Sequence, residues 1–364
     1  MKVKSIVGAA LLLALGLFSL TLTAGELFPQ DTDKSKCVYT DRVQKMPRLR
    51  GVMSPSGKIK EDDLKTLGRW GANLLRYQIV RGWNERNNNQ DRAEYLNWVD
   101  SKITHLLNDV LPWANAAGVQ VIVDLHVAPG GRDQTGDMNM FYDRRHADTF
   151  LMAWTNIATR CAGRKGICGY DLINEPCQRR PSPKDCDLLT LQERAAKLVR
   201  EIDSSTPIIV ESNGWDSPKE FHCMCVFKMK DVIYQAHMYQ PMAFTHQGVP
   251  GVGQSAPTRY PDSSKGWDKD YLRRQLAEVR AFQVTHGARI YIGEFSAIAW
   301  ADGAEAYLRD VNSLCEEYGW DWSYHAFREW QGWSVEHEGP DANHLKPSAD
   351  NPRKRALLDG LSGL

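Results

Sequence analysis

The chain has 364 residues, and its 45 Lys and Arg residues balance 45 Asp and Glu residues, so the formal net charge is zero. Nucleic acids and anionic membranes bind basic surfaces, so this balance argues against both as partners and favours an uncharged one. The length allows two domains, but α/β barrels of about 200–250 residues or more also fold as one unit.

The first residues have the pattern of a secretory signal. Lys2 and Lys4 precede an apolar stretch from Ile6 to Leu22, and small residues follow it. We therefore predict a signal peptide at 1–24, a mature domain at 25–364, and a secreted or periplasmic protein. The alternative is an uncleaved membrane anchor, for which the apolar stretch is short.

Short apolar runs bounded by Gly, Pro or Asn alternate with segments of helical periodicity. We predict strands at Leu49–Met53, Ala72–Val80, Val119–His126, Gly169–Asn174, Pro207–Ser212, Val232–Tyr239, Arg289–Phe295 and Asp321–Phe327. We predict helices at Ala93–Ala117, Tyr142–Ala162, Leu188–Asp203, Asp270–His286 and Ala304–Tyr318. The runs lack polar alternation, which is typical of parallel strands covered on both faces.

Eight such units indicate an α/β fold of the (β/α)8 TIM-barrel type, with a single catalytic domain. The alternative is an open, doubly wound sheet, but no G-x-G-x-x-G follows any predicted strand. Two longer segments, Trp83–Asp91 and Thr245–Lys269, follow predicted strands, and we expect them to be loops at the rim of the barrel.

The chain has eight cysteines, an even number that favours disulfides in an exported protein. We predict a local bridge between Cys177 and Cys186. The alternative is a metal site, but Cys223-x-Cys225 lacks the C-x-x-C spacing of zinc sites and no second pair matches it, so we predict no metal.

Polar side chains close most of the predicted strands. Because the carboxyl ends of the strands of such a barrel form one mouth, these residues should converge there. They are Arg76, His126, Asn174, Glu175, His237, Tyr239, Glu294 and Trp322. Pro176 should bias Glu175 toward extended geometry.

Two carboxylates facing one cavity are what cleavage of a glycosidic bond requires, since one protonates the departing oxygen and the other acts on the anomeric carbon. Glu175 and Glu294 fit this requirement; the alternative is two structural salt-bridge partners. Arg76 on a buried strand needs a carboxylate partner, and Glu294 is the candidate. Among twelve tryptophans, we favour Trp322 as a platform for a sugar ring.

Together these motifs resemble glycoside hydrolase family 5, the cellulase family of retaining β-glycosidases with a (β/α)8 barrel. The resemblance spans about residues 50–333 and rests on Arg76, DLH at 124–126, NEP at 174–176, HMY at 237–239 and GEF at 293–295. It implies that Glu175 is the general acid/base and Glu294 the nucleophile.

The resemblance also implies roles for the neighbouring residues. Asn174 and His126 would line the site of the reacting sugar, His237 would orient Glu175, and Tyr239 and Arg76 would hold Glu294. The family places a tryptophan after strand eight, where WDWSYHAFREW offers Trp322, Phe327 and Trp330.

We therefore expect a monomeric, cofactor-free hydrolase of β-linked polysaccharide or oligosaccharide, closest to an endo-β-1,4-glucanase. β-Mannan and β-1,3-glucan remain alternative substrates. Two other classes stay open: a metal-dependent hydrolase with His126 and His237 as ligands, and a non-catalytic carbohydrate-binding barrel. Retention predicts carboxyl groups about 5–5.5 Å apart, and inversion about 6.5–9.5 Å.

Overall fold

The computed structural model describes residues 36–55, 59–80, 91–252 and 257–363. The predicted signal peptide lies outside these residues, as does most of the loop predicted at Trp83–Asp91. Among the described residues, none of the helices has the length and apolar character needed to cross a bilayer.

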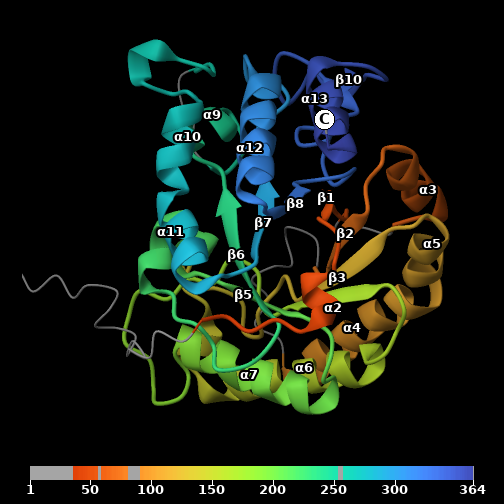
Figure 1. Cartoon of the computed structure of the whole chain (residues 1–364), viewed down its shortest axis with the longest axis vertical. Coiled ribbons are helices and arrows are strands. Elements are labelled where there is room, and N and C mark those ends of the chain that lie inside the picture. Colours follow the sequence, from red (N-terminus) through yellow and green to blue (C-terminus); the bar gives the residue numbers. More distant parts are fainter. Residues whose placement is uncertain (1–35, 56–58, 81–90, 253–256, 364) are drawn as a thin grey trace, which may run out of the picture.

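Eight parallel strands close into a barrel in chain order, each hydrogen-bonded to the next and β8 to β1 (Figure 1). They are β1 (Arg50–Met53), β2 (Leu74–Gln78), β3 (Gln120–Asp124), β4 (Ile167–Asp171), β5 (Ile208–Glu211), β6 (Val232–Met238), β7 (Ile290–Phe295) and β8 (Asp321–Tyr324). Each lies within or overlaps one of the eight predicted strands, so the predicted fold class is confirmed.

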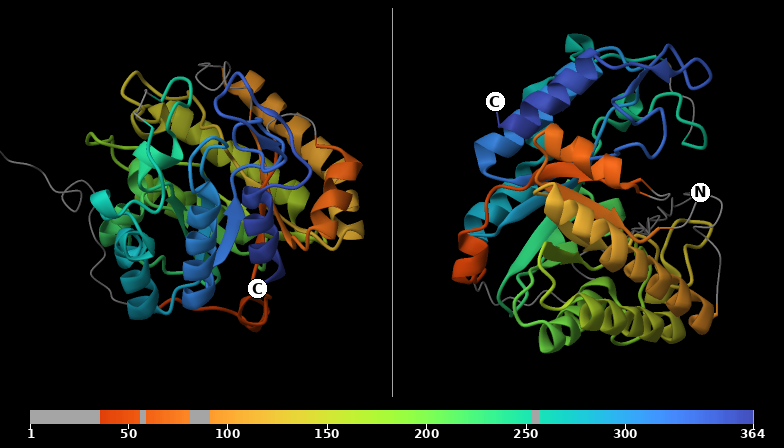
Figure 2. Two further views of the ribbon diagram at one scale, coloured as in Figure 1. Left: turned by 90° about the horizontal axis from the view of Figure 1, so that it is seen from above. Right: turned by 90° about the vertical axis from the view of Figure 1, so that its right-hand side faces the viewer.

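Helices surround the barrel, as the two further views show (Figure 2). The longer ones are α3 (Glu61–Arg69), α4 (Arg92–His105), α5 (Leu111–Ala116), α6 (Arg144–Cys161), α7 (Leu188–Ile202), α10 (Lys269–Gln275), α11 (Ala277–His286), α12 (Ala304–Tyr318) and α13 (Pro352–Ser362). Short helical turns include α2 (Asp41–Gln44), α8 (Asn213–Asp216) and α9 (Met242–Thr245), and β9 (His337–Glu338) pairs with β10 (Lys346–Pro347).

The helix predicted at Ala93–Ala117 is interrupted. A π-helical turn at Leu106–Val110 separates α4 from α5. Pro112 lies in the first turn of α5 and has no backbone N–H, so it cannot donate the hydrogen bond that would continue the helix. The hydrogen-bond pattern therefore shifts just before it.

The barrel interior is apolar at the amino end of the strands. A separate cluster of buried side chains fills this end: Leu49, Leu74, Ile122, Cys168, Ile209, Ile233 and Tyr291. Buried polar side chains gather at the carboxyl ends of the strands, among them Asp124, Asp171, Glu211, His237 and Glu294.

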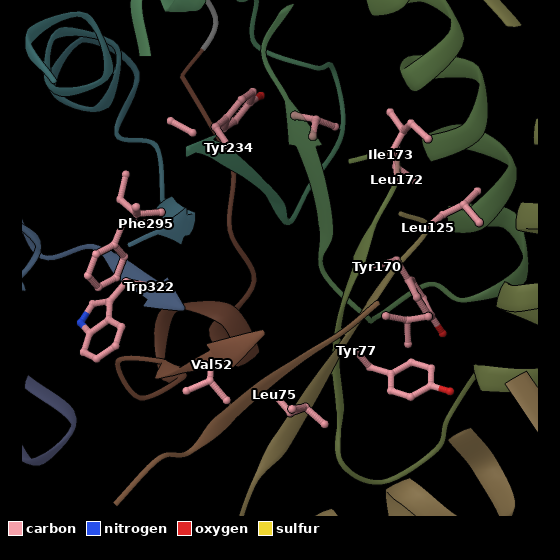
Figure 3. Packing of buried hydrophobic residues seen from close by; sticks show 14 of the residues in the cluster. Val52, Leu75, Tyr77, Leu125, Tyr170, Leu172, Ile173, Tyr234, Phe295 and Trp322 are labelled. Carbon is pink, nitrogen blue, oxygen red and sulfur yellow. The ribbon is translucent and has the colours of Figure 1, made fainter. Parts of the chain in front are cut away.

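A second apolar layer lies between the strands and the helices (Figure 3). Trp322 belongs to this layer, is 0% exposed, and packs with its ring centroid 5.6 Å from that of Phe295. Gly360 of α13 packs close to Asn312 and the indole, because a β-carbon there would clash with Asn312 Nδ2 and lie 3.3 Å from Trp322 Cζ2. The prediction that Trp322 is a sugar platform is wrong, because the side chain points away from the barrel axis.

All eight cysteines are described, and all are free thiols, so the predicted Cys177–Cys186 bridge is not formed. The thiol of Cys177 instead lies 3.6 Å from Asp137 Oδ1. The loop after β4 is held by charge, because Arg179 Nε lies 2.8 Å from Asp137 Oδ1 and Arg180 pairs with both Asp137 and Asp133.

The buried position of Trp322 leads to a test. Trp322→Ala should lower the free energy of unfolding by about 3–5 kcal/mol, because a large cavity is left in the core. If the expected sugar site exists elsewhere, the apparent affinity of the remaining folded protein for sugar should not change. Urea unfolding and steady-state kinetics measure the two effects, with Trp322→Phe as the milder control. A weakened affinity with unchanged stability would restore the platform.

Candidate active site

The barrel brings most of the predicted polar residues to one mouth. Arg76 lies on β2, His237 on β6 and Glu294 on β7. The others follow directly on the carboxyl ends of strands: His126 after β3, Asn174 and Glu175 after β4, and Tyr239 after β6. The closed parallel barrel therefore brings these strand-end residues together at one mouth, as we expected from the sequence.

The two glutamates face each other across His237. Carboxylate oxygens of Glu175 and Glu294 and a nitrogen of His237 all lie within 4.8 Å of one another. His237 Nδ1 is 3.1 Å from Glu175 Oε1 and 3.8 Å from Glu294 Oε2. The side chain of Glu175 is 23% exposed and that of Glu294 only 5%, so Glu175 lies nearer to solvent.

Glu294 is held in its ionised form. The Arg76 guanidinium donates to its Oε1 at 2.7 Å, and the Tyr239 hydroxyl donates to Oε2 at 2.8 Å. Burial alone would raise the pKa of Glu294, but the positive charges of His237, His325 and Arg76 outweigh burial and lower it. A buried carboxylate kept ionised in this way is suited to act as a nucleophile.

Glu175 has left-handed backbone geometry, with φ of 51°, rather than the extended geometry that Pro176 was expected to impose. Contacts to both of its peptide groups account for this. The Glu175 N–H donates to Glu211 Oε2 at 2.6 Å, and Arg132 donates to the Glu175 carbonyl at 2.7 Å. Such a conformation costs about 1–3 kcal/mol, so neighbouring contacts must maintain it.

Opposing influences act on the pKa of Glu175. Burial and the charge of Glu294 act to raise it. The hydrogen bond from His237, together with the charges of His237 and Arg132, outweighs them and lowers the pKa. His237 itself is disfavoured as a cation by burial, but Glu294, Glu175 and Asp216 raise its pKa to about 9.

Arg76 is the hub of the site and contacts carboxylates from four strands. Its Nε donates to Asp171 at 2.8 Å, and its NH2 group lies 3.0 Å from Glu211 and 3.4 Å from Asp124. The fourth is Glu294. Burial raises the pKa of Asp124 to about 7 and that of Asp171 to about 6, although Arg76 opposes both shifts.

The sequence reasoning did not assign Asp124, Asp171 or Glu211 to the site. Each is the last residue of its strand. Asp124 and Glu211 also follow apolar runs, which is the signal that identified Glu294, whereas Asp171 lies inside the run that ends at Ile173. Asp124 also orients His126, whose Nδ1 lies 2.8 Å from Asp124 Oδ2. The other ring nitrogen of His126 lies 3.2 Å from the side-chain nitrogen of Asn174.

The residue that follows β8 is His325, not a tryptophan. Its ring centroid lies 6.1 Å from that of Tyr239 and 5.5 Å from that of Trp333, and its Nε2 is 3.2 Å from Glu329. Trp330, predicted to contact the sugar, is partly buried and packs edge-on against Trp333, with centroids 6.0 Å apart. Trp330 therefore belongs to an aromatic cluster with Trp300 and Trp333.

Trp215 is an aromatic side chain whose role the sequence left undefined. It is 45% exposed, and the Arg132 guanidinium lies 4.1 Å from the centre of its ring. Its backbone N–H donates to the carbonyl of Pro176 at 3.1 Å, which places it next to Glu175. An exposed ring braced by a cation is available for stacking.

The Arg76 hub predicts a pH-dependent loss of stability. Arg76→Met should destabilise the fold by about 3–5 kcal/mol at pH 8, because carboxylates are left buried without their cation. The loss should be smaller at pH 5, since Asp124 and Asp171 have raised pKa values and hold protons there in the folded state. Urea unfolding at the two pH values measures the difference.

Arg50→Met is the matched control for this experiment. Arg50 pairs with the partly exposed Glu316 at 2.7 Å and lowers the pKa of that carboxyl, so the pair is ionised at both pH values. The control should lose about 0–1 kcal/mol at each. An equal loss for Arg76→Met at pH 5 and pH 8 would contradict the assignment of proton-holding partners.

Comparison with known proteins identifies the family. A model of the cellulase family (glycosyl hydrolase family 5) matches residues 39–335. Endoglucanase C of Acetivibrio thermocellus is 25% identical over 302 residues, which cover 73% of this chain and 84% of that protein. Cellodextrinase A of Ruminococcus flavefaciens is 20% identical over 268 residues, covering 72% and 76%.

Solved structures agree on the fold. Thermotoga maritima Cel5A in complex with cellobiose matches with a TM-score of 0.66 at 21% identity, over 86% of this chain and 97% of that one. Its complex with mannotriose matches with a TM-score of 0.65, also at 21% identity and over 86% and 97% of the two chains. With the family model spanning most of its length, the chain belongs to the cellulase family, glycosyl hydrolase family 5, and is a glycoside hydrolase.

Proposed function

We propose that this chain is a secreted, retaining endo-β-1,4-glucanase that works by double displacement with Glu294 as nucleophile and Glu175 as acid/base. One observation carries the proposal: carboxylate oxygens of the two residues lie within 4.8 Å. Inverting enzymes need about 6.5–9.5 Å between the carboxyl groups to admit a water molecule, and retaining enzymes about 5–5.5 Å.

In the first step, Glu294 attacks the anomeric carbon as the bond to the departing oxygen breaks, and Glu175 gives its proton to that oxygen. A glycosyl ester of Glu294 results. In the second step, Glu175 removes a proton from water, the water oxygen attacks the anomeric carbon, and the ester bond to Glu294 breaks. The product keeps the β configuration, and both glutamates regain their starting states.

The electrostatics support this exchange of roles. The negative charge of Glu294 acts to raise the pKa of Glu175 in the free enzyme, against the larger lowering by His237 and Arg132. Once Glu294 is esterified, that charge is gone and the pKa of Glu175 falls, so the residue is a better base in the second step. His237, 3.1 Å from Glu175, stabilises the carboxylate form.

The remaining residues position substrate and catalysts. Asn174 and His126, hydrogen-bonded to each other, would contact the hydroxyls of the reacting sugar. Arg76 and Tyr239 hold the nucleophile through hydrogen bonds to its two oxygens. Trp330 and the aromatic cluster around it would contact sugar beside the reacting ring.

The substrate assignment rests on the relatives. Two are described as an endoglucanase and a cellodextrinase, which favours β-1,4-glucan. The mannotriose complex of Cel5A keeps β-mannan as an alternative, and β-1,3-glucan also stays open. The metal-dependent alternative loses support, because His126 and His237 are each hydrogen-bonded to a different catalytic-site carboxylate.

Removing either glutamate tests the mechanism. Glu175→Ala and Glu294→Ala should each lower kcat by several orders of magnitude on β-1,4-glucan oligosaccharides while the fold is retained. Glu278→Ala, on the exposed surface of α11, is the matched control. NMR should show β-anomeric product first. An α-anomer would indicate inversion, and binding without turnover on every β-glucan and β-mannan tested would favour the non-catalytic barrel.

Trp215 is proposed to stack on the leaving-group side of the cleft, because it adjoins the acid/base. Trp215→Ala should raise KM by about 2- to 10-fold, corresponding to about 0.5–1.5 kcal/mol of stacking. The rate on an aryl glycoside that has no sugar in the leaving group should be unchanged. Trp98→Ala, on the outer helix α4, serves as the control, and an unchanged KM in the Trp215 variant would exclude the platform.

A further inference from the structure

The turn after β5 is conformationally strained. Gly214, Trp215 and Asp216 in α8 have successive left-handed φ values of 64°, 66° and 53°. Only glycine adopts this region without cost, so two of the three residues are held against their preference. Strained backbone of this kind is concentrated at functional sites and must be maintained by contacts around it.

Contacts with the loop after β4 maintain the turn. Besides the bond from the Trp215 N–H to Pro176, Asn213 accepts from the Gln178 N–H at 2.8 Å and donates to the Gln178 carbonyl at 2.9 Å. The result is that successive side chains diverge. Trp215 points to solvent, whereas Asp216 is 0% exposed.

The carboxylate of Asp216 lies behind His237. Its Oδ1 accepts from the backbone N–H of Ser212 at 2.7 Å and from the Ser212 hydroxyl at 3.0 Å. Its Oδ2 accepts no hydrogen bond from the described residues and lies 3.8 Å from His237 Nε2. The opposite nitrogen of the same ring, Nδ1, is the one that contacts Glu175.

Two other groups lie near His237 Nε2. The Gln235 side-chain nitrogen is 3.4 Å away, and Glu211 Oε1 is 4.0 Å away. Oε1, the Glu211 oxygen that lies near His237, already accepts from Arg76 and Gln235, and Oε2 accepts from the Glu175 N–H. Asp216 is therefore the neighbouring carboxylate with an oxygen left for the imidazole.

A cation could in principle occupy this place, because ligand atoms of Glu211, Asp216 and His237 lie within 4.8 Å of one another. The two hydrogen bonds that Glu211 Oε1 already accepts argue against it, as does the positive charge of the Arg76 guanidinium 3.0 Å from that oxygen. A proton between Asp216 and His237 requires neither a free Glu211 oxygen nor another positive charge beside Arg76.

We infer that Asp216 is a positioning residue for proton transfer, which stabilises the His237 imidazolium from behind and keeps its Nδ1–H directed at Glu175. The inference rests on the proposed role of Glu175 as acid/base. Other titratable or charged groups also interact with His237 or Glu175 and set the background that every variant shares: Asp124, Arg132, Asp171, Glu211, Tyr239, His246, Glu294 and His325.

The pH dependence follows from the charges. Burial raises the pKa of Asp216 to about 8, and the pKa of His237 is raised to about 9 in part by Asp216. When Asp216 ionises, it favours the imidazolium and so retains the proton that Glu175 needs. A neutral residue at 216 would let His237 lose this proton at lower pH, so activity would end earlier as pH rises.

Asp216→Asn tests this directly, with kcat/KM measured from pH 5 to pH 9 on β-1,4-glucan oligosaccharides. At pH 5 the variant should remain within about 3-fold of the wild type. The basic limb of the profile of kcat/KM against pH should move to lower pH by about one unit. At pH values above this limb, kcat/KM of the variant should therefore be about 10-fold lower than that of the wild type. Asp203→Asn, a buried aspartate at the end of α7, is the control and should leave the limb in place.

An independent measurement does not depend on turnover. Titration of the imidazole nitrogens by 15N NMR should give a lower pKa for His237 in Asp216→Asn than in the wild type. If that variant does not fold, Ser212→Ala replaces it. Removing the Ser212 hydroxyl further raises the pKa of Asp216, so the limb should move in the same direction by a smaller amount.

Several outcomes would overturn the inference. They are an equal loss of kcat/KM at every pH, an unchanged His237 titration, and a shift of the His237 Nε2 resonance on adding Zn²⁺, which would mean a metal site instead. Failure of the proposed function is recognised separately, because Glu175→Gln would then keep full activity on oligosaccharides. If Glu175→Gln is inactive but the basic limb of the pH profile of Asp216→Asn is unshifted, only the role of Asp216 is excluded.

Discussion

The structure depends on one buried cation. Arg76 is 0% exposed and joins carboxylates from β3, β4, β5 and β7, so four strands that are separate in the chain share one charge. Without a cation, burial would neutralise these acids. With it, Glu294 stays ionised in a place where water cannot stabilise it, although Asp124 and Asp171 still have raised pKa values.

The two loops after β4 and β5 act as one unit. The Glu175 N–H donates to Glu211, and Asn213 and Trp215 bond to backbone groups after β4. These bonds hold left-handed residues on both sides, at Glu175 and at Asp216. The contacts between the loops maintain this geometry, which places the carboxylates of Glu175 and Asp216 near opposite nitrogens of His237 and leaves the Trp215 indole exposed.

Sequence patterns predicted the positions of the site better than its interactions. A charge closing an apolar run identified Glu175 and Glu294, and the same pattern at Asp124 and Glu211 was passed over because a buried acid has no evident role until its partner is known. Trp322 was misassigned because successive residues of a strand point alternately to the barrel interior and to the helix layer. Which residues point inward depends on where the strand begins to pair, and the sequence of a short strand does not show this. The residue that follows β8, where the family resemblance implied a tryptophan, is His325.

The sequence by itself determined the eight-stranded parallel barrel and the mouth at which its polar residues meet, because continuous apolar runs alternating with amphipathic helices have few other ways to be buried. Only the tertiary structure decided which side chains face that mouth, that the eight cysteines remain thiols, and that His237 lowers the pKa of Glu175. These properties depend on distances of a few ångströms between residues far apart in the chain, and spacing along a sequence carries no information about them.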